Sequence, residues 1–292
     1  MNISGKTKVY AVIGHPVAHS LSPVMHNANF AANGDDAVYV AFDVAPDRVV
    51  EAVHSLHALG CGGLSVTIPH KEVLFRGIKL LDESATLAGA VNTVEFSADG
   101  PKGYNTDGEG FVKSFHHEFG PMTGKQVAVL GNGGSARSVA IAAIKDGASE
   151  VTIVGRDFEK AAALANDMKT SPAIAYALGC TPADAIKALH MIDRIELMVA
   201  DVVVNATPIG MKKNDVSIFS SIPFKRTACA MDLIYTFPET QFMKAAKAGG
   251  SKTANGLGML LHQGAKQYEI WTGKKANLDA MRTALEKAVY GK

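Results

Sequence analysis

Residues 126–156, QVAVLGNGGSARSVAIAAIKDGASEVTIVGR, decide the fold of the second part of the chain. An apolar run ends at a glycine-rich turn, a helical segment follows and closes at Gly147, and a second apolar run ends at Gly155. Strand, turn, helix and strand in this order form one βαβ unit of a parallel, doubly wound sheet. The apolar runs at 200–208 and 228–235 predict further strands, so we expect an α/β fold with a Rossmann-type domain.

The turn GNGGSA fits the pattern G-x-G-x-x-G/A through Gly131, Gly133 and Ala136. The match is informative because it follows a strand and opens a helix. Gly131 permits the tight turn, Gly133 lets the backbone approach a pyrophosphate, and Ala136 keeps the helix close to the sheet. We therefore expect phosphates at the free N–H groups of this segment, which comprises Gly131, Asn132, Gly133, Gly134, Ser135 and Ala136. The alternative is a glycine turn that packs the domain and binds nothing.

The end of the second strand bears on the choice of cofactor. An acidic residue there binds the ribose 2′-hydroxyl of NAD, whereas an arginine accommodates the 2′-phosphate of NADP. The chain offers both, as Arg156 and Asp157, with Lys160 about one helical turn later. Because Asp157 is well placed to cap the next helix, the pattern favours NADP, and NAD stays open.

Length and composition limit the class of protein. The 292 residues suffice for two domains, and we expect boundaries at 1–106, 107–241 and 242–292, the last being helices that pack back on the first domain. A net charge of +1 does not support binding to nucleic acid or to a membrane surface. The three cysteines, Cys61, Cys180 and Cys229, show no disulfide or zinc spacing. With no signal peptide or membrane-spanning run evident, we expect a cytoplasmic protein.

The first part of the chain also alternates strand and helix. Within HSLSPVMHN, at 19–27, Ser22 fits a helix N-cap and Pro23 the first helical position. Two hydroxyls ahead of a helix can instead form a pocket for an anion, together with the N–H groups of the helix start. Strands are expected at 8–14, 37–44, 62–68 and 90–96, and Asp99-Gly100 predicts a hairpin.

Lys71 and Asp107 are candidates for proton transfer. A lysine beside a carboxylate in a cleft can take the hydroxyl proton while a nicotinamide takes the hydride from carbon. Their spacing alone favours the alternative, a surface lysine and an aspartate at a helix start. No histidine pattern, including that of His15 and His19, indicates a metal site.

Taken together, the motifs resemble the shikimate dehydrogenase family from end to end. The matching stretches are GHPVAHSLSPVMHN, SVTIPHK, GAVNT, YNTDGEG, LGNGGSAR, NATPIGM, DLIY and GLGMLLHQGA. The resemblance implies two α/β domains with the active-site cleft between them and a nicotinamide cofactor, usually NADP. It also implies the reversible reduction of 3-dehydroshikimate to shikimate, a step of the shikimate pathway of aromatic amino-acid biosynthesis.

The resemblance also assigns roles to residues. It implies that Ser20 and Ser22 hold the substrate carboxylate and that Lys71 transfers the proton with Asp107 beside it. The other implied substrate contacts are Thr67, Asn92, Tyr235 and Gln263. Near the cofactor it places Asn205, Thr207, Met211 and Gly256, in addition to the glycine turn and to Arg156, Asp157 and Lys160.

Three departures from the family pattern affect specificity. Ser65 stands where the family usually has Asn in NVTxPxK, Gly155-Arg156-Asp157 stands where NADP-type members commonly have Asn-Arg-Thr, and Leu21 stands where lysine is frequent. A leucine at position 21 resembles the sequences of the quinate/shikimate branch of the family. A dehydrogenase of quinate or of a close analogue is therefore an alternative. A ring-acid sensor with the same fold and a folate-type dehydrogenase are the other two. For all of these the partner is a small molecule, and a monomer or homodimer is expected.

Overall fold

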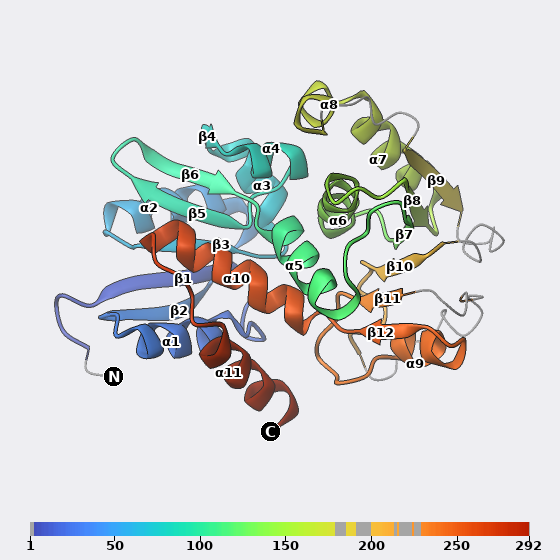
Figure 1. Ribbon diagram of the computed structural model, residues 1–292. Helices are drawn as coiled ribbons and strands as arrows, with labels where there is room; N and C mark the ends of the chain where they lie inside the picture. Colours follow the sequence, from blue (N-terminus) through green and yellow to red (C-terminus); the bar gives the residue numbers. More distant parts are fainter. Residues whose placement is uncertain are drawn as a thin grey trace. The chain divides into compact units, whose positions relative to one another are not determined.

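The computed structural model describes residues 3–178, 185–190, 200–212, 215, 224 and 229–291. Cys180, considered above, lies outside the described residues. The chain divides into two compact units (Figure 1). Unit 1 comprises Met1–Gly110 and Leu261–Lys292, and unit 2 comprises Phe111–Leu260. Helices α5 (Asp107–Phe119) and α10 (Leu257–Thr272) each contain one of these boundaries.

Unit 1 contains a mixed sheet with the strand order β2-β1-β3-β5-β6-β4. Its strands are β1 (Lys8–Gly14), β2 (Ala37–Asp43), β3 (Gly63–Val66), β4 (Leu80–Leu81), β5 (Thr93–Ser97) and β6 (Gly100–Tyr104). Its helices, besides parts of α5 and α10, are α1 (Ser22–Asn33), η1 (Pro46–Arg48), α2 (Val49–Ala58), α3 (His70–Gly77), α4 (Glu83–Ala88) and α11 (Leu278–Tyr290).

The pairing of these strands fixes where the connecting loops meet. β1 runs parallel to both β2 and β3, whereas β5 and β6 form an antiparallel pair, which confirms the hairpin predicted at Asp99-Gly100. Because β1 and β3 are parallel neighbours, their carboxyl ends lie at the same edge of the sheet. The loops that follow Gly14 and Val66 therefore start side by side.

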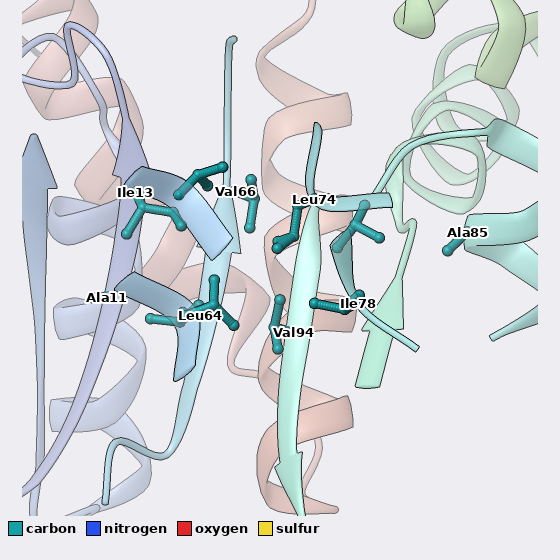
Figure 2. Close-up of a cluster of buried hydrophobic side chains, with 11 residues drawn as sticks. Ala11, Ile13, Leu64, Val66, Leu74, Ile78, Ala85 and Val94 are labelled. Carbon is teal, nitrogen blue, oxygen red and sulfur yellow. The ribbon is translucent and has the colours of Figure 1, made fainter. Parts of the chain in front are cut away.

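One face of this sheet is covered by a buried apolar cluster (Figure 2). Strands β1 and β3 contribute Ile13 and Leu64, and helix α3 contributes Leu74. All three side chains are completely buried. Burial of a leucine or isoleucine side chain of this size is worth about 1.5–3 kcal/mol, so this cluster holds α3 and the loop before it against the sheet.

Unit 2 confirms the predicted doubly wound sheet. Its strands are β7 (Gln126–Leu130), β8 (Glu150–Gly155), β9 (Ile186–His190), β10 (Val202–Asn205), β11 (Cys229–Asp232) and β12 (Lys252–Ala254). Their order is β12-β11-β10-β7-β8-β9, and every pair is parallel. The helices are α6 (Gly134–Lys145), α7 (Phe158–Thr170), α8 (Pro172–Leu178) and α9 (Gln241–Ala248), with the remaining parts of α5 and α10.

The unit boundaries differ from the expected ones in one respect. Residues 242–292 were expected as helices that pack on the first domain, but β12 pairs with β11 and extends the second sheet. Helix α9 belongs to the same unit, with Phe242 and Ala246 in the core cluster of that sheet. The second unit therefore continues to Leu260, because one more strand follows the last one that the apolar pattern revealed.

Candidate active site

The loops after β1 and β3 bring the first set of predicted residues to one edge of the sheet in unit 1. The N–H of Thr67 donates to the carbonyl of Ile13 at 2.9 Å, and the N–H of His15 donates to the carbonyl of Ile68 at 3.1 Å. Gly14 permits this approach, because a Cβ there would lie 2.5 Å from Cγ2 of Thr67. The loop that carries Ser20 and Ser22 is thus anchored beside the loop that leads to Lys71.

The predicted N-cap at Ser22 is wrong. Helix α1 begins at Ser22 itself, its N-cap is Leu21, and no side-chain hydrogen bond caps it. Instead, Oγ of Ser20 accepts a hydrogen bond of 3.3 Å from the N–H of Ser22. Ser20, two residues before Ser22, thus binds an N–H group at the start of the helix, and the Ser22 hydroxyl does not cap it.

Lys71 and Asp107 form an ion pair. Nζ of Lys71 lies 2.6 Å from Oδ2 of Asp107, and the two side chains are 24% and 9% exposed. Lys71 lies in the first turn of α3, and Asp107 is the first residue of α5. A carboxylate is favoured at a helix start, where the backbone N–H groups have no intrahelical partner. The pair is therefore formed, and it is partly open to solvent on the lysine side.

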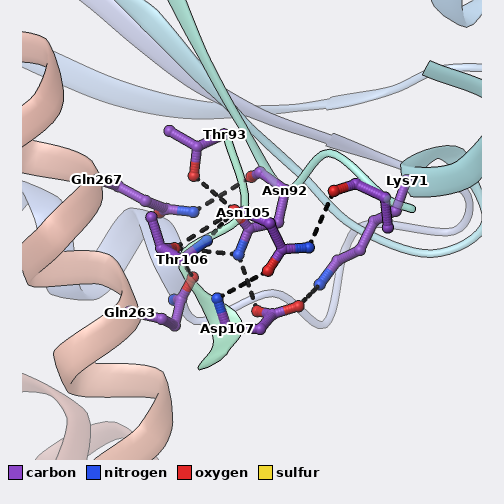
Figure 3. A network of polar contacts seen from close by, with 9 residues as sticks. Lys71, Asn92, Thr93, Asn105, Thr106, Asp107, Gln263 and Gln267 are labelled. Carbon is purple, nitrogen blue, oxygen red and sulfur yellow. Dashed lines mark hydrogen bonds and ion pairs between the residues drawn. The ribbon is translucent and has the colours of Figure 1, made fainter. Parts of the chain in front are cut away.

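Asn92 holds the aspartate of this pair in place (Figure 3). Its Nδ2 donates to Oδ1 of Asp107 at 2.8 Å, on the carboxylate oxygen that does not contact Lys71. Its Oδ1 accepts hydrogen bonds from the N–H of Thr106 at 2.9 Å and from the hydroxyl of Thr93 at 2.7 Å. The N–H of Asp107 donates to Oδ1 of Asn105 at 3.0 Å. Every polar atom of the Asn92 side chain is thus satisfied, and the carboxylate is fixed from behind.

Gln263 joins this group, and Tyr235 belongs to the other unit. The hydroxyl of Thr106 lies 3.5 Å from Oε1 of Gln263, and the glutamine is 8% exposed. Tyr235 follows β11 in unit 2, where burial raises the pKa of its hydroxyl. Lys71, Asp107, Asn92 and Gln263 are therefore brought together within unit 1, along with the serine and threonine loops.

The structure adds side chains that the sequence analysis did not identify. Gln267 lies one turn after Gln263 on α10, and its Nε2 donates to the carbonyl of Asn92 at 3.2 Å. Its Oε1 accepts from Ser65, which in turn accepts from Tyr39. The contacts of Gln267 with Ser65 and with Asn92 span 202 and 175 positions along the chain, so no local pattern could reveal them. The one available signal was the serine at position 65, where the family usually has asparagine.

The glycine turn in unit 2 fits a dinucleotide phosphate. Gly131 has a φ of +119°, and a Cβ there would meet the carbonyl of Ala206 at 3.0 Å. Side chains at Gly133 and Gly134 would meet nothing within 4 Å, so space is open beside the start of α6. Its N-cap, Gly133, provides no side-chain cap, and Ala136 is completely buried. Uncapped N–H groups beside open space form an anion site, so the residues present fit the pyrophosphate of a nicotinamide cofactor.

The end of β8 also has the expected arrangement. Asp157 is the N-cap of α7, as predicted, and its Oδ1 accepts from the N–H of Lys160 at 3.2 Å. Nζ of Lys160 lies 3.2 Å from Oδ2 of Asp157, and the hydrogen bonds from Lys160 lower the pKa of that carboxyl. Arg156 is exposed. The carboxylate is occupied by the helix start and by Lys160, which leaves the guanidinium available for an anion.

Asn205 and Thr207 form a turn next to the glycine loop. Asn205 pairs in register with Leu130 at the end of β7. Its Oδ1 accepts from the hydroxyl of Thr207 at 2.7 Å, and its Nδ2 donates to Oδ1 of Asp232 at 2.9 Å. Burial raises the pKa of Asp232 to about 6. Asn205 is completely buried, so it shapes this turn through its own hydrogen bonds.

Met211 and Gly256 have different surroundings. Met211 is 47% exposed. A Cβ on Gly256 would lie 2.0 Å from the carbonyl oxygen of Leu233, so this glycine lets the start of α10 approach the end of β11.

Among the described residues, no three His, Cys, Asp or Glu side chains gather as a metal site would require. No helix in the described ranges is long and apolar enough to cross a membrane.

Comparison with known protein families gives matches along most of the chain. Residues 12–94 match the shikimate dehydrogenase substrate binding domain. Residues 113–208 match the family described as shikimate / quinate 5-dehydrogenase, and residues 256–286 match the shikimate 5'-dehydrogenase C-terminal domain. The first matched segment lies in unit 1, the second lies in unit 2, and the third begins in unit 2 and continues into the second chain segment of unit 1.

Individual relatives match over nearly their whole length. Shikimate dehydrogenase (NADP(+)) of Methanopyrus kandleri is 41% identical over 290 residues, which are 98% of this chain and 97% of that protein. A crystal structure of a shikimate dehydrogenase in complex with NADP+ has a TM-score of 0.90 at 40% identity and covers 99% of this chain and 98% of its own. The quinate dehydrogenase of Corynebacterium glutamicum in complex with NAD has a TM-score of 0.84 at 29% identity, covering 95% and 98%.

Proposed function

The chain belongs to the shikimate dehydrogenase family, and we propose that it catalyses the reversible, NADP-dependent reduction of 3-dehydroshikimate to shikimate. The observation that carries this proposal is the ion pair of Lys71 and Asp107, 2.6 Å apart and fixed by Asn92, in a chain that also has the uncapped glycine turn. An alcohol dehydrogenase requires both a group that exchanges the hydroxyl proton and a site for a nicotinamide cofactor.

In this reaction Lys71 exchanges the proton of the reacting hydroxyl. NADP supplies the hydride chemistry when it is bound. Asp107 holds the Lys71 ammonium through Oδ2, and Asn92 holds the carboxylate through Oδ1, so the lysine Nζ has a fixed position. A proton donor or acceptor that is held in place requires little reorganisation when the substrate hydroxyl reaches it. Lys71 is the proton-transfer residue in this proposal, and Asp107 lies beside it.

The substrate carboxylate binds at Ser20 and Ser22. Ser20 precedes α1 and Ser22 is its first residue, and the first turn of this helix adds partial positive charge. Thr67, Asn92 and Gln263 of unit 1 contact the ring hydroxyls. A contact of Tyr235 with the substrate stays a prediction. An acid held at one end of a small ring has few orientations left, which brings the reacting hydroxyl to Lys71.

The cofactor binds at the glycine turn of unit 2. The N–H groups at 131–136 receive the pyrophosphate, with Asn205, Thr207, Met211 and Gly256 in the adjoining loops. Arg156 receives the 2′-phosphate, supported by its exposure and by the engagement of Asp157 as a helix cap. Lys160 adds positive charge, although its contact with Asp157 offsets part of it.

An enzyme assay tests the proposal directly. The purified protein is mixed with shikimate and NADP, and the absorbance of the reduced nicotinamide is followed, with matched reactions that contain NAD or quinate. We expect the highest kcat/KM for shikimate with NADP. No reduction of either cofactor with shikimate, from a folded protein, would refute the proposed activity.

The second candidate function is a quinate dehydrogenase. The likeness to the quinate dehydrogenase of C. glutamicum and the description of the family that matches residues 113–208 favour it. A higher kcat/KM for quinate than for shikimate, together with a preference for NAD, would establish this function instead. A cytoplasmic location and a monomeric or homodimeric state stay predictions.

A further inference from the structure

A buried carboxylate lies at the carboxyl edge of the sheet in unit 2. Asp232 is the last residue of β11, pairs in register with Asn205 at the end of β10, and is completely buried. Its Oδ1 accepts from Nδ2 of Asn205 at 2.9 Å and from the N–H of Ile234 at 3.1 Å. Its Oδ2 accepts from the hydroxyl of Thr240 at 2.5 Å. Asp232 therefore joins the turn after β10, the turn after β11 and the start of α9.

The carboxylate determines which way the Asn205 amide faces. Burial raises the pKa of Asp232 to about 6, so the side chain is mainly ionised at pH 7 and accepts hydrogen bonds without donating any. The NH2 group of Asn205 therefore faces Asp232, and its Oδ1 faces the turn. There Oδ1 accepts from the N–H of Thr207 at 3.1 Å and from its hydroxyl at 2.7 Å. The Thr207 oxygen accepts in turn from the N–H of Ile209 at 3.2 Å, so the shape of this turn depends on Asp232.

A second branch leads from Ile234 to the start of α10. The carbonyl of Ile234 accepts from the N–H of Gly256 at 3.1 Å, while its N–H is held by Asp232. The N–H of Leu233 donates to the carbonyl of Asn205 at 3.0 Å, which ties the two turns to each other. The turns after β10 and β11 and the loop before α10 therefore form one connected group, with Asp232 at its centre.

The strand order places this group on one side of the glycine turn. In the order β11-β10-β7-β8, the glycine turn follows β7 and Arg156 follows β8. A doubly wound sheet binds a dinucleotide across the point where the strand order reverses, which is between β10 and β7 here. With the pyrophosphate at β7 and the adenosine ribose at β8, the nicotinamide half extends over β10 and β11. The loops that Asp232 joins are those on the nicotinamide side.

We propose that Asp232 is a positioning residue that holds the loops on the nicotinamide side of the cofactor site in the conformation that binds NADP. Because it is completely buried, it acts through Asn205 and Ile234 and does not itself contact the cofactor. Without the carboxylate, three buried donors lose their acceptor, and they regain partners only if the turns move. The inference rests on the proposed function, in which NADP binds at the glycine turn.

The test compares NADP with adenosine 2′,5′-bisphosphate, which contains the adenosine half of the cofactor and lacks the nicotinamide half. Both ligands are titrated by isothermal titration calorimetry against the wild type, Asp232→Ala and Asp232→Asn. The asparagine is the conservative variant, because its oxygen can accept from Asn205 and Ile234 and its NH2 group can donate to the oxygen of Thr240.

Asp146→Ala is the matched control. Asp146 also lies in unit 2, and its side chain is 13% exposed. Its Oδ2 accepts from the N–H of Met122 at 2.8 Å, so its removal also leaves a backbone donor without its acceptor. Asp146 ends α6, which leads from the carboxyl end of β7 to the amino end of β8. The control therefore removes a carboxylate from the same unit, at the opposite edge of the sheet.

We expect Asp232→Ala to raise the Kd of NADP about tenfold or more, and the Kd of adenosine 2′,5′-bisphosphate less than about twofold. Asp232→Asn and Asp146→Ala should bind both ligands within about twofold of the wild type. In hydrogen exchange without ligand, the amides of Ile234 and Gly256 should exchange faster in Asp232→Ala and at the wild-type rate in Asp146→Ala.

Equal weakening of both ligands in Asp232→Ala, or wild-type affinity of that variant for NADP, would overturn the role of Asp232 and leave the enzyme assignment intact. If Asp232→Ala does not fold, Asp232→Ser, which retains one oxygen, is titrated instead and must show the same selective loss of NADP. Failure of the wild-type protein to bind NADP is a separate result, which removes the proposed function and this inference with it.

Discussion

Acid should destabilise unit 1 through His26. This ring is completely buried, and burial lowers its pKa from 6.5 to about 3. The folded state therefore prefers the neutral ring, whereas the unfolded chain binds a proton below pH 6.5. The free energy of unfolding is at its full value above pH 6.5 and falls as the pH decreases toward 3. Each pH unit below 6.5 costs about 1.4 kcal/mol, so the change from pH 7 to pH 4 removes about 3 kcal/mol of unfolding free energy.

Urea unfolding at pH 7 and at pH 4, followed by the fluorescence of Trp271, measures this change. Trp271 belongs to unit 1 and its ring lies 5.3 Å from that of His26, so the signal reports on the unit in question. His26→Phe keeps an aromatic ring against Tyr39 but cannot gain a proton. We expect this variant to lose about 3 kcal/mol less than the wild type on acidification. The exposed His54, changed to Gln, is the matched control. If His26→Phe and the wild type lose the same free energy, the reasoning is refuted.

Three further predictions concern catalysis, the cofactor and the second unit. Lys71→Ala should lower kcat for shikimate by about 10²-fold or more, with a smaller change in KM, and a folded variant with normal kcat would contradict its role. Arg156→Ala should raise KM for NADP about tenfold and leave KM for NAD unchanged, whereas Asp157→Ala should affect NADP little; the reverse pattern in steady-state kinetics would indicate an NAD enzyme. Burial raises the pKa of Asp232 from 3.8 to about 6, so the folded state prefers the protonated carboxyl, and the wild type should lose about 3 kcal/mol of unfolding free energy as the pH rises from 3.8 through about 6. Asp232→Asn should not show this loss. Hydrogen exchange of the β11 amides at several pH values measures this, and an unchanged slope in the variant would rule it out.

Local patterns predicted the elements of the fold well. The parallel sheet of unit 2, the hairpin at Asp99-Gly100 and the N-cap at Asp157 all follow from residues within a few positions of one another. β12 was missed because three residues are too short for a detectable apolar period. The N-cap at Ser22 was assigned wrongly because Ser20 is an equally good acceptor, and the helix begins one residue earlier than the proline suggested.

The candidate site was predictable only in part. Motifs identified Lys71 and Asp107, but their spacing of 36 residues could not show that the side chains meet. The hydrogen bond between Ser65 and Gln267 was not foreseen, because the two residues are 202 positions apart along the chain. Contacts of this kind depend on how β3 and α10 pack, which is a property of the tertiary structure.

The division of unit 1 into two chain segments determines the order in which the protein can fold during synthesis. Residues 111–260, about 150 in number, leave the ribosome after the first sheet and before the rest of α10. At about 5–20 residues per second the first sheet waits roughly 8–30 seconds for that helix. Until then Tyr10 and Tyr39 lack Tyr268, with which they share a core cluster, and Asn92 lacks Gln267. We therefore expect nascent chains that end at residue 260 to expose an apolar face to proteases and chaperones. Full-length chains released from the ribosome should be protected from cleavage. Equal cleavage of the first 110 residues in both kinds of chain would contradict this order.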